Sequence, residues 1–446
     1  MNALWTADEL KTLFGTKQGW DVSGISIDTR SLQPGDLFVA LAGGRDGHDF
    51  VEAAFSKGAA AALVSRPTAG NTILVADTLN ALETLGKMAR ARASAKAVAV
   101  TGSVGKTTVK EMLRRTLSEF GKVHAAEASF NNHIGVPLTL ARMPRDSEFG
   151  IFEIGMNHPG EIAPLAALVR PDLAIITCVD RAHLGLMGSE LAIAKEKASI
   201  YASLKPGGTA IIPGETAYLQ VLREALPADC CGLLFNGPEA RLLDVLSGPE
   251  NAEIAAEVLD QKVYFRLAAP GRHMASNALA VLTAAAALGL DVEKAAAALN
   301  GFTPYAGRGT RRVLKLSGGG KILLLDESYN ASGASMRAAF SVLKLQPGRH
   351  VAVLGDMLEL GEHTNAEHLA LAPALREAAD VVFSAGAGCE GLFESLPQAM
   401  QGAHAPNAAA LAPLVKAALR DGDAVLVKGS YGSRMRDVIF ALESTG

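Results

Sequence analysis

Residues 101–108 have the residue types of a phosphate-binding loop, with Val100 where the strict G-x₄-G-K pattern has its first glycine. They read TGSVGKTT and lie between an apolar, strand-like run at 97–101 and a helical run at 109–120. Glycines in such a turn let backbone N–H groups converge on phosphate oxygens at the start of a helix. Lys106 would neutralise the β and γ phosphates of a nucleotide, and the Thr107 hydroxyl would bind Mg²⁺. The expected phosphate contacts are Gly102, Ser103, Val104, Gly105, Lys106, Thr107 and Thr108.

Two more side chains with metal-binding chemistry follow strand-like runs. Glu153 lies near the end of the run at 150–155, and His183 comes shortly after the run at 173–177. The carboxyl ends of strands form the edge of an open α/β sheet where ligands bind, so both side chains are candidate ligands of a metal ion there. A structural ion pair for the glutamate and a plain surface position for the histidine remain as alternatives.

A helical run next to His183 carries two lysines. Lys195 and Lys197 lie two residues apart in SELAIAKEKASIYASL. Residues at i and i+2 project from nearly opposite sides of a helix, so at most one of the two faces the site. The spacing does not choose between them, and two solvated surface lysines are the plain alternative.

The elements that would position these residues follow an alternating pattern. Apolar strand-like runs alternate with Ala- and Leu-rich helical runs, which indicates an α/β protein with mostly parallel sheets. Near the N-terminus, strands are expected at GISIDTR, GDLFVAL and AALVS, with a helix at DFVEAAFSKGA. Further strands are expected at 97–101, 150–155, 173–177 and 209–213, and then at 322–326, 351–355, 381–386 and 424–429. The pattern predicts a small N-terminal α/β domain, a doubly wound central sheet and a Rossmann-like C-terminal domain, at 1–80, 81–312 and 313–446.

Composition narrows the classes of protein further. The 446 residues suffice for about three domains of ordinary size. The 42 basic and 46 acidic side chains leave a net charge of -4, which gives no overall field to attract nucleic acid. The four cysteines lack zinc-site spacing, and neither a secretory signal nor a membrane-spanning run is expected. A cytoplasmic protein without a nucleic-acid or membrane partner is therefore predicted.

Many segments together resemble the Mur ligase family of peptidoglycan-precursor enzymes, and within it the branch that adds D-alanyl-D-alanine. NNHIGVPLTL, MNHPGEI and LGDMLELG are specific to that branch, whereas the phosphate-binding loop and KASIY occur across the family. The similar segments are SIDTR…PGDLFVALAGGRDGHDF (26–50), TGSVGKTTVKEM (101–112), FNNHIGVPLTL (130–140), EIGMNHPGEI (153–162), AHLGLMGS (182–189), KASIY (197–201), PGRHMASNALA (270–280), GR (307–308), YNASGASMRAAF (329–340), LGDMLELG (354–361) and VLVKGS (425–430).

The resemblance implies an N-terminal domain for the UDP end of a precursor, a central ATPase domain and a C-terminal domain that closes on it. It implies ATP and two Mg²⁺ ions as cofactors. Thr107 and Glu153 would bind one ion, and His183 with a carbamylated Lys197 would bind the other. The family pattern places Ile and an aromatic residue three and four positions after the lysine, which selects Lys197 over Lys195. The implied catalytic residues are Lys106, Lys197, His183 and Arg308.

The resemblance also implies further contacts. The expected nucleotide contacts are Asn277 and Arg308 in the central domain and Asp326, Glu327, Tyr329 and Asn330 in the C-terminal domain. The expected contacts with the UDP-muramoyl-peptide are Thr29, Arg30, Asn131, Asn132, Asn157 and His158. The implied reaction joins UDP-N-acetylmuramoyl-tripeptide to D-alanyl-D-alanine through an acyl phosphate, and a monomer is expected.

Two other interpretations share part of this evidence. Another ligase of the superfamily, either the tripeptide-forming enzyme or a folylpolyglutamate synthase, would share the loop at 101–108. The tripeptide-forming enzymes carry an Asp-Asn-Pro-Arg motif that this sequence lacks. A nucleotide switch that makes no bond would also share the loop, but it would need neither NNHIGVPLTL nor a second Rossmann-like domain. We therefore expect the ligase.

Overall fold

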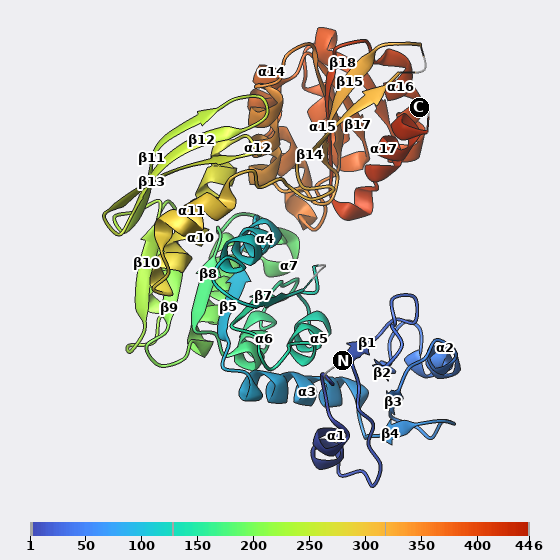
Figure 1. Ribbon diagram of the computed structural model, residues 1–446. Coiled ribbons are helices and arrows are strands. Elements are labelled where there is room, and N and C mark those ends of the chain that lie inside the picture. The colour runs from blue at the N-terminus through green and yellow to red at the C-terminus, as the bar shows by residue number, and fades with distance from the viewer. Residues whose placement is uncertain (1–2, 127–128, 317, 445–446) are drawn as a thin grey trace.

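The computed structural model describes residues 3–126, 129–316 and 318–444, which form three α/β units, each built around its own sheet (Figure 1). The central unit joins the other two, which lie apart from one another at its two ends. Within the described residues, no helix combines the length and apolarity needed to cross a membrane.

The N-terminal unit is a four-stranded parallel sheet of order β1-β2-β3-β4. Its strands and helices are β1 (Gly24–Ser26), β2 (Asp36–Val39), β3 (Ala61–Val64), β4 (Thr72–Leu74), α1 (Ala7–Phe14), α2 (Val51–Ser56) and α3 (Thr78–Arg92). The three predicted strands and the predicted helix are present, whereas β4 was not predicted. The apolar face of α3 buries Leu82 and Leu85 in a core that also includes Leu138 of the central unit. The predicted limit at residue 80 falls inside α3, and the three domain ranges stay a prediction.

The central unit contains a nine-stranded sheet of order β13-β12-β11-β10-β9-β8-β5-β7-β6. The parallel strands are β5 (Lys96–Thr101), β6 (Val123–Ala125), β7 (Phe149–Glu153), β8 (Leu173–Ile176), β9 (Thr209–Pro213) and β10 (Cys231–Phe235). The four strands predicted here are therefore confirmed. An extension, β11 (Ala240–Ser247), β12 (Ala252–Val258) and β13 (Gln261–Leu267), pairs antiparallel and was not predicted. Its strands alternate buried with exposed residues, because one face is solvated and the other is covered by α10.

The helices of the central unit follow its strands. They are α4 (Lys106–Leu117), α5 (Gly135–Ala141), α6 (Ile162–Val169), α7 (Leu184–Met187), α8 (Glu190–Ala198), α9 (Leu219–Glu224), α10 (Arg272–Ala287) and α11 (Val292–Leu299). The helix expected at 109–120 is α4, which begins three residues earlier than predicted. It begins there because Gly105 already occupies its N-cap position.

The C-terminal unit is a six-stranded sheet of order β14-β15-β19-β16-β17-β18. The strands are β14 (Thr310–Lys315), β15 (Lys321–Glu327), β16 (His350–Gly355), β17 (Val381–Ala385), β18 (Gln401–Ala405) and β19 (Ala424–Lys428). The helices are α12 (Gly333–Leu343), α13 (Thr364–Leu369), α14 (Ala372–Ala378), α15 (Ala387–Glu394), α16 (Ala408–Ala418) and α17 (Arg436–Glu443). Only β14 runs antiparallel among these strands, and the four predicted strands are confirmed as β15, β16, β17 and β19.

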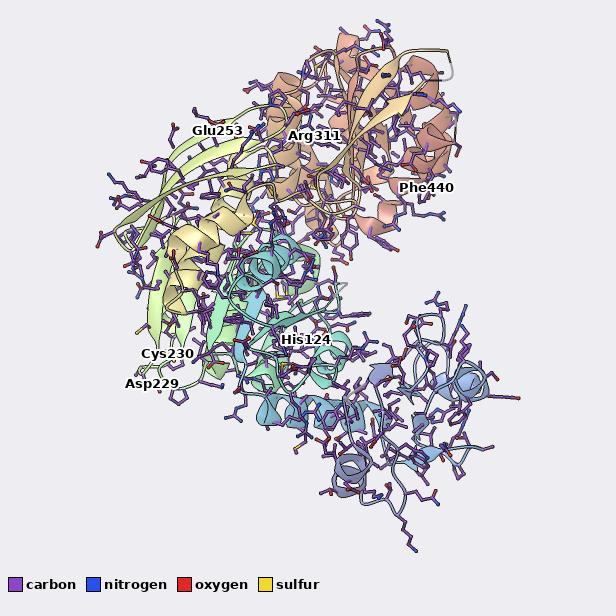
Figure 2. All side chains as sticks on the ribbon, in the orientation of Figure 1. His124, Asp229, Cys230, Glu253, Arg311 and Phe440 are labelled. Carbon is purple, nitrogen blue, oxygen red and sulfur yellow. The ribbon has the colours of Figure 1, made fainter. Side chains whose placement is uncertain are left out.

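The central and C-terminal units meet near the start of β14. Figure 2 shows the side chain of Arg311 at this junction, between the sheet extension and the C-terminal helices. Its guanidinium donates to Gln346 Oε1 at 3.1 Å and lies 3.8 Å from Glu250 Oε1. Residues of both units therefore contact each other close to the point where the chain passes between them.

Candidate active site

A cavity of about 450 Å³ is lined by residues of the central and C-terminal units. It is the place where most of the site residues predicted from the sequence come together. Those that line it are Ser103, Val104, Gly105, Lys106, Thr107, Thr108, Asn131, Asn132, Glu153, Asn157, His183, Asn277, Arg308, Glu327, Tyr329 and Asn330.

The loop between β5 and α4 has the backbone that the glycines predict. Gly105 has φ +88° and caps α4, and Gly102 has φ +150°. A Cβ atom on Gly102 would lie 1.8 Å from Thr177 Oγ1, so the loop passes too close to the end of β8 for any side chain. Open backbone N–H groups at the start of α4 therefore face the cavity, as an anion site requires.

The Lys106 ammonium folds over this loop. Its Nζ donates to Gly102 O at 2.6 Å. Burial lowers its pKa below the ordinary lysine value, and the neighbouring Glu153 carboxylate acts in the opposite direction. A cation held inside a phosphate-sized loop is suited to an anionic ligand.

Glu153 ends β7 as a carboxylate with 1% of its surface exposed. Its Oε2 accepts a hydrogen bond from Thr107 Oγ1 at 2.8 Å, and its Oε1 accepts one from Asn131 Nδ2 at 2.8 Å. The three side chains bring together carboxylate, hydroxyl and amide oxygens, which are the ligands that Mg²⁺ prefers. Thr107 and Glu153, the two residues expected to bind one Mg²⁺, are therefore in direct contact, and the metal site itself stays a prediction.

His183 lies at the boundary of the two units. It caps α7 in a left-handed conformation, with φ 63°, and its Nδ1 is paired with Glu359 Oε2 of the C-terminal unit. This contact lowers the pKa of Glu359, through the hydrogen bond from His183 first and against the effect of burial. The sequence offered no signal for the partner, because Glu359 is distant along the chain and becomes a neighbour only through the packing of the two units.

Lys197 and Lys195 differ completely in their surroundings. Lys195 is exposed on α8, whereas Lys197 is 1% exposed. Among the described residues, the hydrogen-bonding contact of Lys197 Nζ is Met156 Sδ at 4.0 Å. Burial, followed by repulsion from Lys106, lowers the pKa of Lys197 to about 7. A substantial fraction of this amine is therefore neutral near pH 7.

Arg308 and Tyr329 approach the cavity from the linker and from the C-terminal unit. The guanidinium carbon of Arg308 lies 4.1 Å from the centre of the Tyr329 ring, and Arg308 Nη2 lies 3.4 Å from Ser129 Oγ. Asn277 of α10 reaches the loop, where its Oδ1 is 2.8 Å from the position of a Cβ on Gly105. Most of the predicted nucleotide contacts of both units thus lie around one cavity.

Lys428 was missed by the sequence analysis. It ends β19, is 2% exposed and lines the cavity, where its Nζ donates to Asn330 O at 3.0 Å and lies 3.4 Å from Glu327 Oε2. The signal was available, because Lys428 ends a buried parallel strand as Glu153 does.

Some predicted residues do not line the cavity. Gly102 lies beneath the loop, Lys197 is buried behind Met156, and the Asp326 carboxylate accepts hydrogen bonds from the backbone of Gly307 and Ser328. His158 is exposed nearby. Thr29 and Arg30 belong to the N-terminal unit, where Arg30 is paired with Asp28 at 2.6 Å.

Family models match three consecutive stretches of the chain. They are described as "Mur ligase family, catalytic domain" at residues 21–98, "Mur ligase middle domain" at 100–285 and "Mur ligase, glutamate ligase domain" at 311–431. Each match covers most of one of the three sheets.

Similar proteins extend over the whole chain. The UDP-N-acetylmuramoyl-tripeptide–D-alanyl-D-alanine ligase of Escherichia coli K12 is 34% identical over 97% of this chain and 97% of its own. A crystal structure of MurF from Acinetobacter baumannii has a TM-score of 0.88 and 29% identity, with 100% of both chains covered. MurF from Thermotoga maritima, solved in complex with ADP, has a TM-score of 0.81 and 27% identity, over 95% of this chain and 97% of its own.

Proposed function

The chain belongs to the Mur ligase family and is an ATP-dependent peptide ligase, and from this we propose that it joins D-alanyl-D-alanine to UDP-N-acetylmuramoyl-tripeptide in peptidoglycan-precursor synthesis. The observation that carries the proposal is the single cavity that the phosphate-binding loop shares with residues of the C-terminal unit. The names of the similar ligases supply the two substrates.

We propose that the cavity binds ATP. The glycine loop and Lys106 hold the phosphates, while Asn277 and Arg308 contact the nucleotide from the central side. Glu327, Tyr329 and Asn330 do so from the C-terminal side, and Asp326 supports them by fixing the backbone of Gly307 and Ser328. The ADP complex of the similar Thermotoga maritima MurF supports this assignment.

Two magnesium sites are part of the proposal. Thr107 and Glu153 provide an oxygen-rich set for the first, and the described contacts of these residues fit such an ion. His183 and Lys197 would hold the second ion, but an ammonium cannot bind a cation. Lys197 fits only as a carbamate, which forms when its neutral amine adds CO₂ and loses a proton. Mg²⁺ bound at these sites would add positive charge beside the phosphoryl group during transfer.

The reaction needs this concentration of cations. A substrate carboxylate and a phosphate at about 4 Å repel each other by about 4 kcal/mol per pair of unit charges at an effective dielectric of about 20. Lys106 and Arg308 offset that repulsion while the carboxylate attacks the γ-phosphorus, forming an acyl phosphate and releasing ADP. The amine of D-alanyl-D-alanine then attacks the acyl carbon, and phosphate leaves from the tetrahedral intermediate as the amide forms.

The precursor would extend from the cavity to the N-terminal unit. Asn131, Asn132 and Asn157 line the cavity and are proposed to contact the peptide arm, with His158 beside them. Thr29 and Arg30 are proposed to contact the UDP end. We propose a monomer in the cytoplasm. The four free cysteines support the cytoplasmic setting, because thiols persist in a reducing compartment.

An omission series tests the function. Phosphate release from MgATP is measured with UDP-muramoyl-tripeptide and D-alanyl-D-alanine supplied singly and together. The mass of the product is determined by mass spectrometry. The proposal predicts release that needs both substrates and a pentapeptide product. Lys106→Met should lower this turnover by about 10³-fold or more, because it removes the positive charge that stabilises the transferring phosphoryl group in the transition state. Lys195→Met, on the exposed side of α8, is the matched control.

Other outcomes would redirect the assignment. Release that needs a different amine would move the chain to another branch of the family. Release indifferent to both substrates would contradict ligation and indicate a nucleotide switch.

A further inference from the structure

The segment 178–183, which follows β8, is bonded to the phosphate-binding loop. Ser103 N donates to Cys178 O at 3.0 Å, and Ser103 Oγ donates to Asp180 O at 2.8 Å. In return, Asp180 N donates to Ser103 Oγ at 2.9 Å. Because all three bonds use a backbone atom of the segment, they tie the segment to the loop.

The side chains of the same segment contact the C-terminal unit. Asp180 Oδ2 accepts hydrogen bonds from Ser332 Oγ at 3.3 Å and from Ala334 N at 3.4 Å. Ser332 is the N-cap of α12, whose positive end favours a carboxylate. Ser332 and Ala334 also line the cavity and follow Asn330 closely. Asp180 therefore fixes the first turn of α12 where it borders the cavity.

Arg181 makes a second connection to the C-terminal unit. Its Nη1 donates to Glu367 Oε1 of α13 at 2.6 Å, and its Nε pairs with Glu190 of α8. Glu367 is 7% exposed, and Arg181 is its ion-pair partner among the described residues. Without Arg181, a carboxylate would be left buried and unpaired, which is costly. Glu367 does not line the cavity.

We propose that Asp180 and Arg181 are positioning residues that couple the phosphate-binding loop to the placement of the C-terminal unit. This inference rests on the proposed binding of ATP in the cavity. A nucleotide that orders the loop also orders segment 178–183, which holds α12 and α13 at the distance where Tyr329 and Asn330 reach the same nucleotide. By linkage, weakening the contacts of Asp180 or Arg181 weakens nucleotide binding, although neither side chain touches the cavity.

The test is a double-mutant cycle read out as ADP affinity in the presence of Mg²⁺. Titration calorimetry compares the full-length wild type with Arg181→Gln, Glu367→Ala and the double variant. Each single change should weaken ADP binding by about 3- to 10-fold, and the double variant should lose no more than one of them, because the two residues act as a unit. Asp180→Ala should cause a similar loss, and Asp180→Asn, which keeps an acceptor oxygen, should restore part of it.

The matched control is Arg241→Gln. The side chain of Arg241 is 54% exposed, close to the 51% of Arg181, and it also forms an ion pair. Its partner, Glu257, lies within the central sheet, so this pair does not connect two units. The control should bind ADP within twofold of wild type, and melting temperatures identify any variant that fails to fold. Arg181→Lys, which keeps the positive charge, should bind ADP more tightly than Arg181→Gln.

Two results would overturn the inference. One is unchanged ADP affinity in Arg181→Gln and Asp180→Ala. The other is a cycle in which the losses of Arg181→Gln and Glu367→Ala simply multiply. Failure of the wild type to bind ADP or to ligate would instead contradict the proposed function, so the two failures are distinguishable.

Discussion

Two lysines on one short helix have opposite environments. Lys195 and Lys197 are both charged residues of α8, yet Lys195 is exposed and Lys197 is buried next to Met156. The helix turns by about 200° between them, so one side chain is buried when the other faces water. The lowered pKa of Lys197, about 7, leaves the neutral amine that carbamylation needs.

Replacing Lys197 should therefore abolish ligation. Lys197→Met, which keeps the buried volume, should lower turnover by about 100-fold or more, since the carboxylate of the proposed carbamate is lost. Wild type incubated with ¹³C-bicarbonate should show a carbamate signal by ¹³C NMR, and the signal should be missing in Lys197→Met.

Lys195→Met serves as the control and should keep both the signal and the turnover. Normal turnover by Lys197→Met would contradict the carbamate and, with it, the proposed second metal site.

The turn between β5 and α4 requires glycine at position 102 because its backbone passes close to Thr177. Gly102 lies against Thr177 at the end of β8, and a Cβ atom there would sit 1.8 Å from the Thr177 hydroxyl. Gly207 also has a positive φ, +73°, but open space around it. The two glycines therefore separate backbone strain from steric exclusion.

Gly102→Ala should displace the loop and weaken ADP binding by about 10-fold or more, because the backbone N–H groups would no longer converge. Gly207→Ala carries the strain alone, so its ADP affinity should stay within twofold while its melting temperature falls. Titration calorimetry and thermal melting check both. Equal affinities of the two variants would contradict the close-approach argument.

Helices α1 and α3 are joined by a cluster of charges. Glu9 Oε1 accepts from Arg92 Nη1 at 2.9 Å, and Arg145 pairs with the same oxygen. Burial would raise the pKa of Glu9, but hydrogen bonds from Arg145, the Thr6 backbone and Arg92 together lower it to about 2. The stabilisation from this carboxylate is thus present above its ordinary pKa and is lost as the pH falls from about 4.5 towards 2.

Glu9→Gln should lower the free energy of unfolding at pH 7 by about 1 kcal/mol. The difference from wild type should shrink as the pH falls from 4.5 towards 2, because the wild-type carboxylate then becomes protonated. Urea unfolding at pH 7 and pH 3 measures it. A difference that stays constant over this range would show that charge at Glu9 does not stabilise the fold.

At the scale of the whole molecule, we propose that different units recognise the parts of the substrate. Arg30 is exposed in the N-terminal unit and does not line the cavity. Its proposed role concerns the UDP end of the precursor, which is chemically remote from the phosphates of ATP.

Arg30→Ala should raise the KM for the UDP-muramoyl-tripeptide by about 10-fold, the value of one lost charged hydrogen bond, while the KM for ATP stays the same. Steady-state kinetics with each substrate varied in turn checks it. Lys17→Ala, which removes another exposed cation of the same unit, should leave both KM values unchanged. A rise in the KM for ATP would contradict the separation of the two sites.

The α/β class, the positions of most parallel strands along the chain and the candidate phosphate-binding loop could be predicted from the sequence alone. These follow from local chemistry: short apolar runs such as β5 and β9 favour buried strands, and a Gly-rich turn followed by lysine suits phosphate. The antiparallel strands β11–β13 escaped prediction because their alternating, half-solvated pattern carries a weaker signal than a continuous apolar run.

Which distant residues become neighbours depends on the tertiary structure. The spacing on α8 left Lys195 and Lys197 equivalent, and burial of Lys197 next to Met156 separated them. The pairing of His183 with Glu359, and of Arg181 with Glu367, depends on how the two units pack. Contacts between units are set by the relative position of whole sheets, and no local pattern in the chain encodes that position.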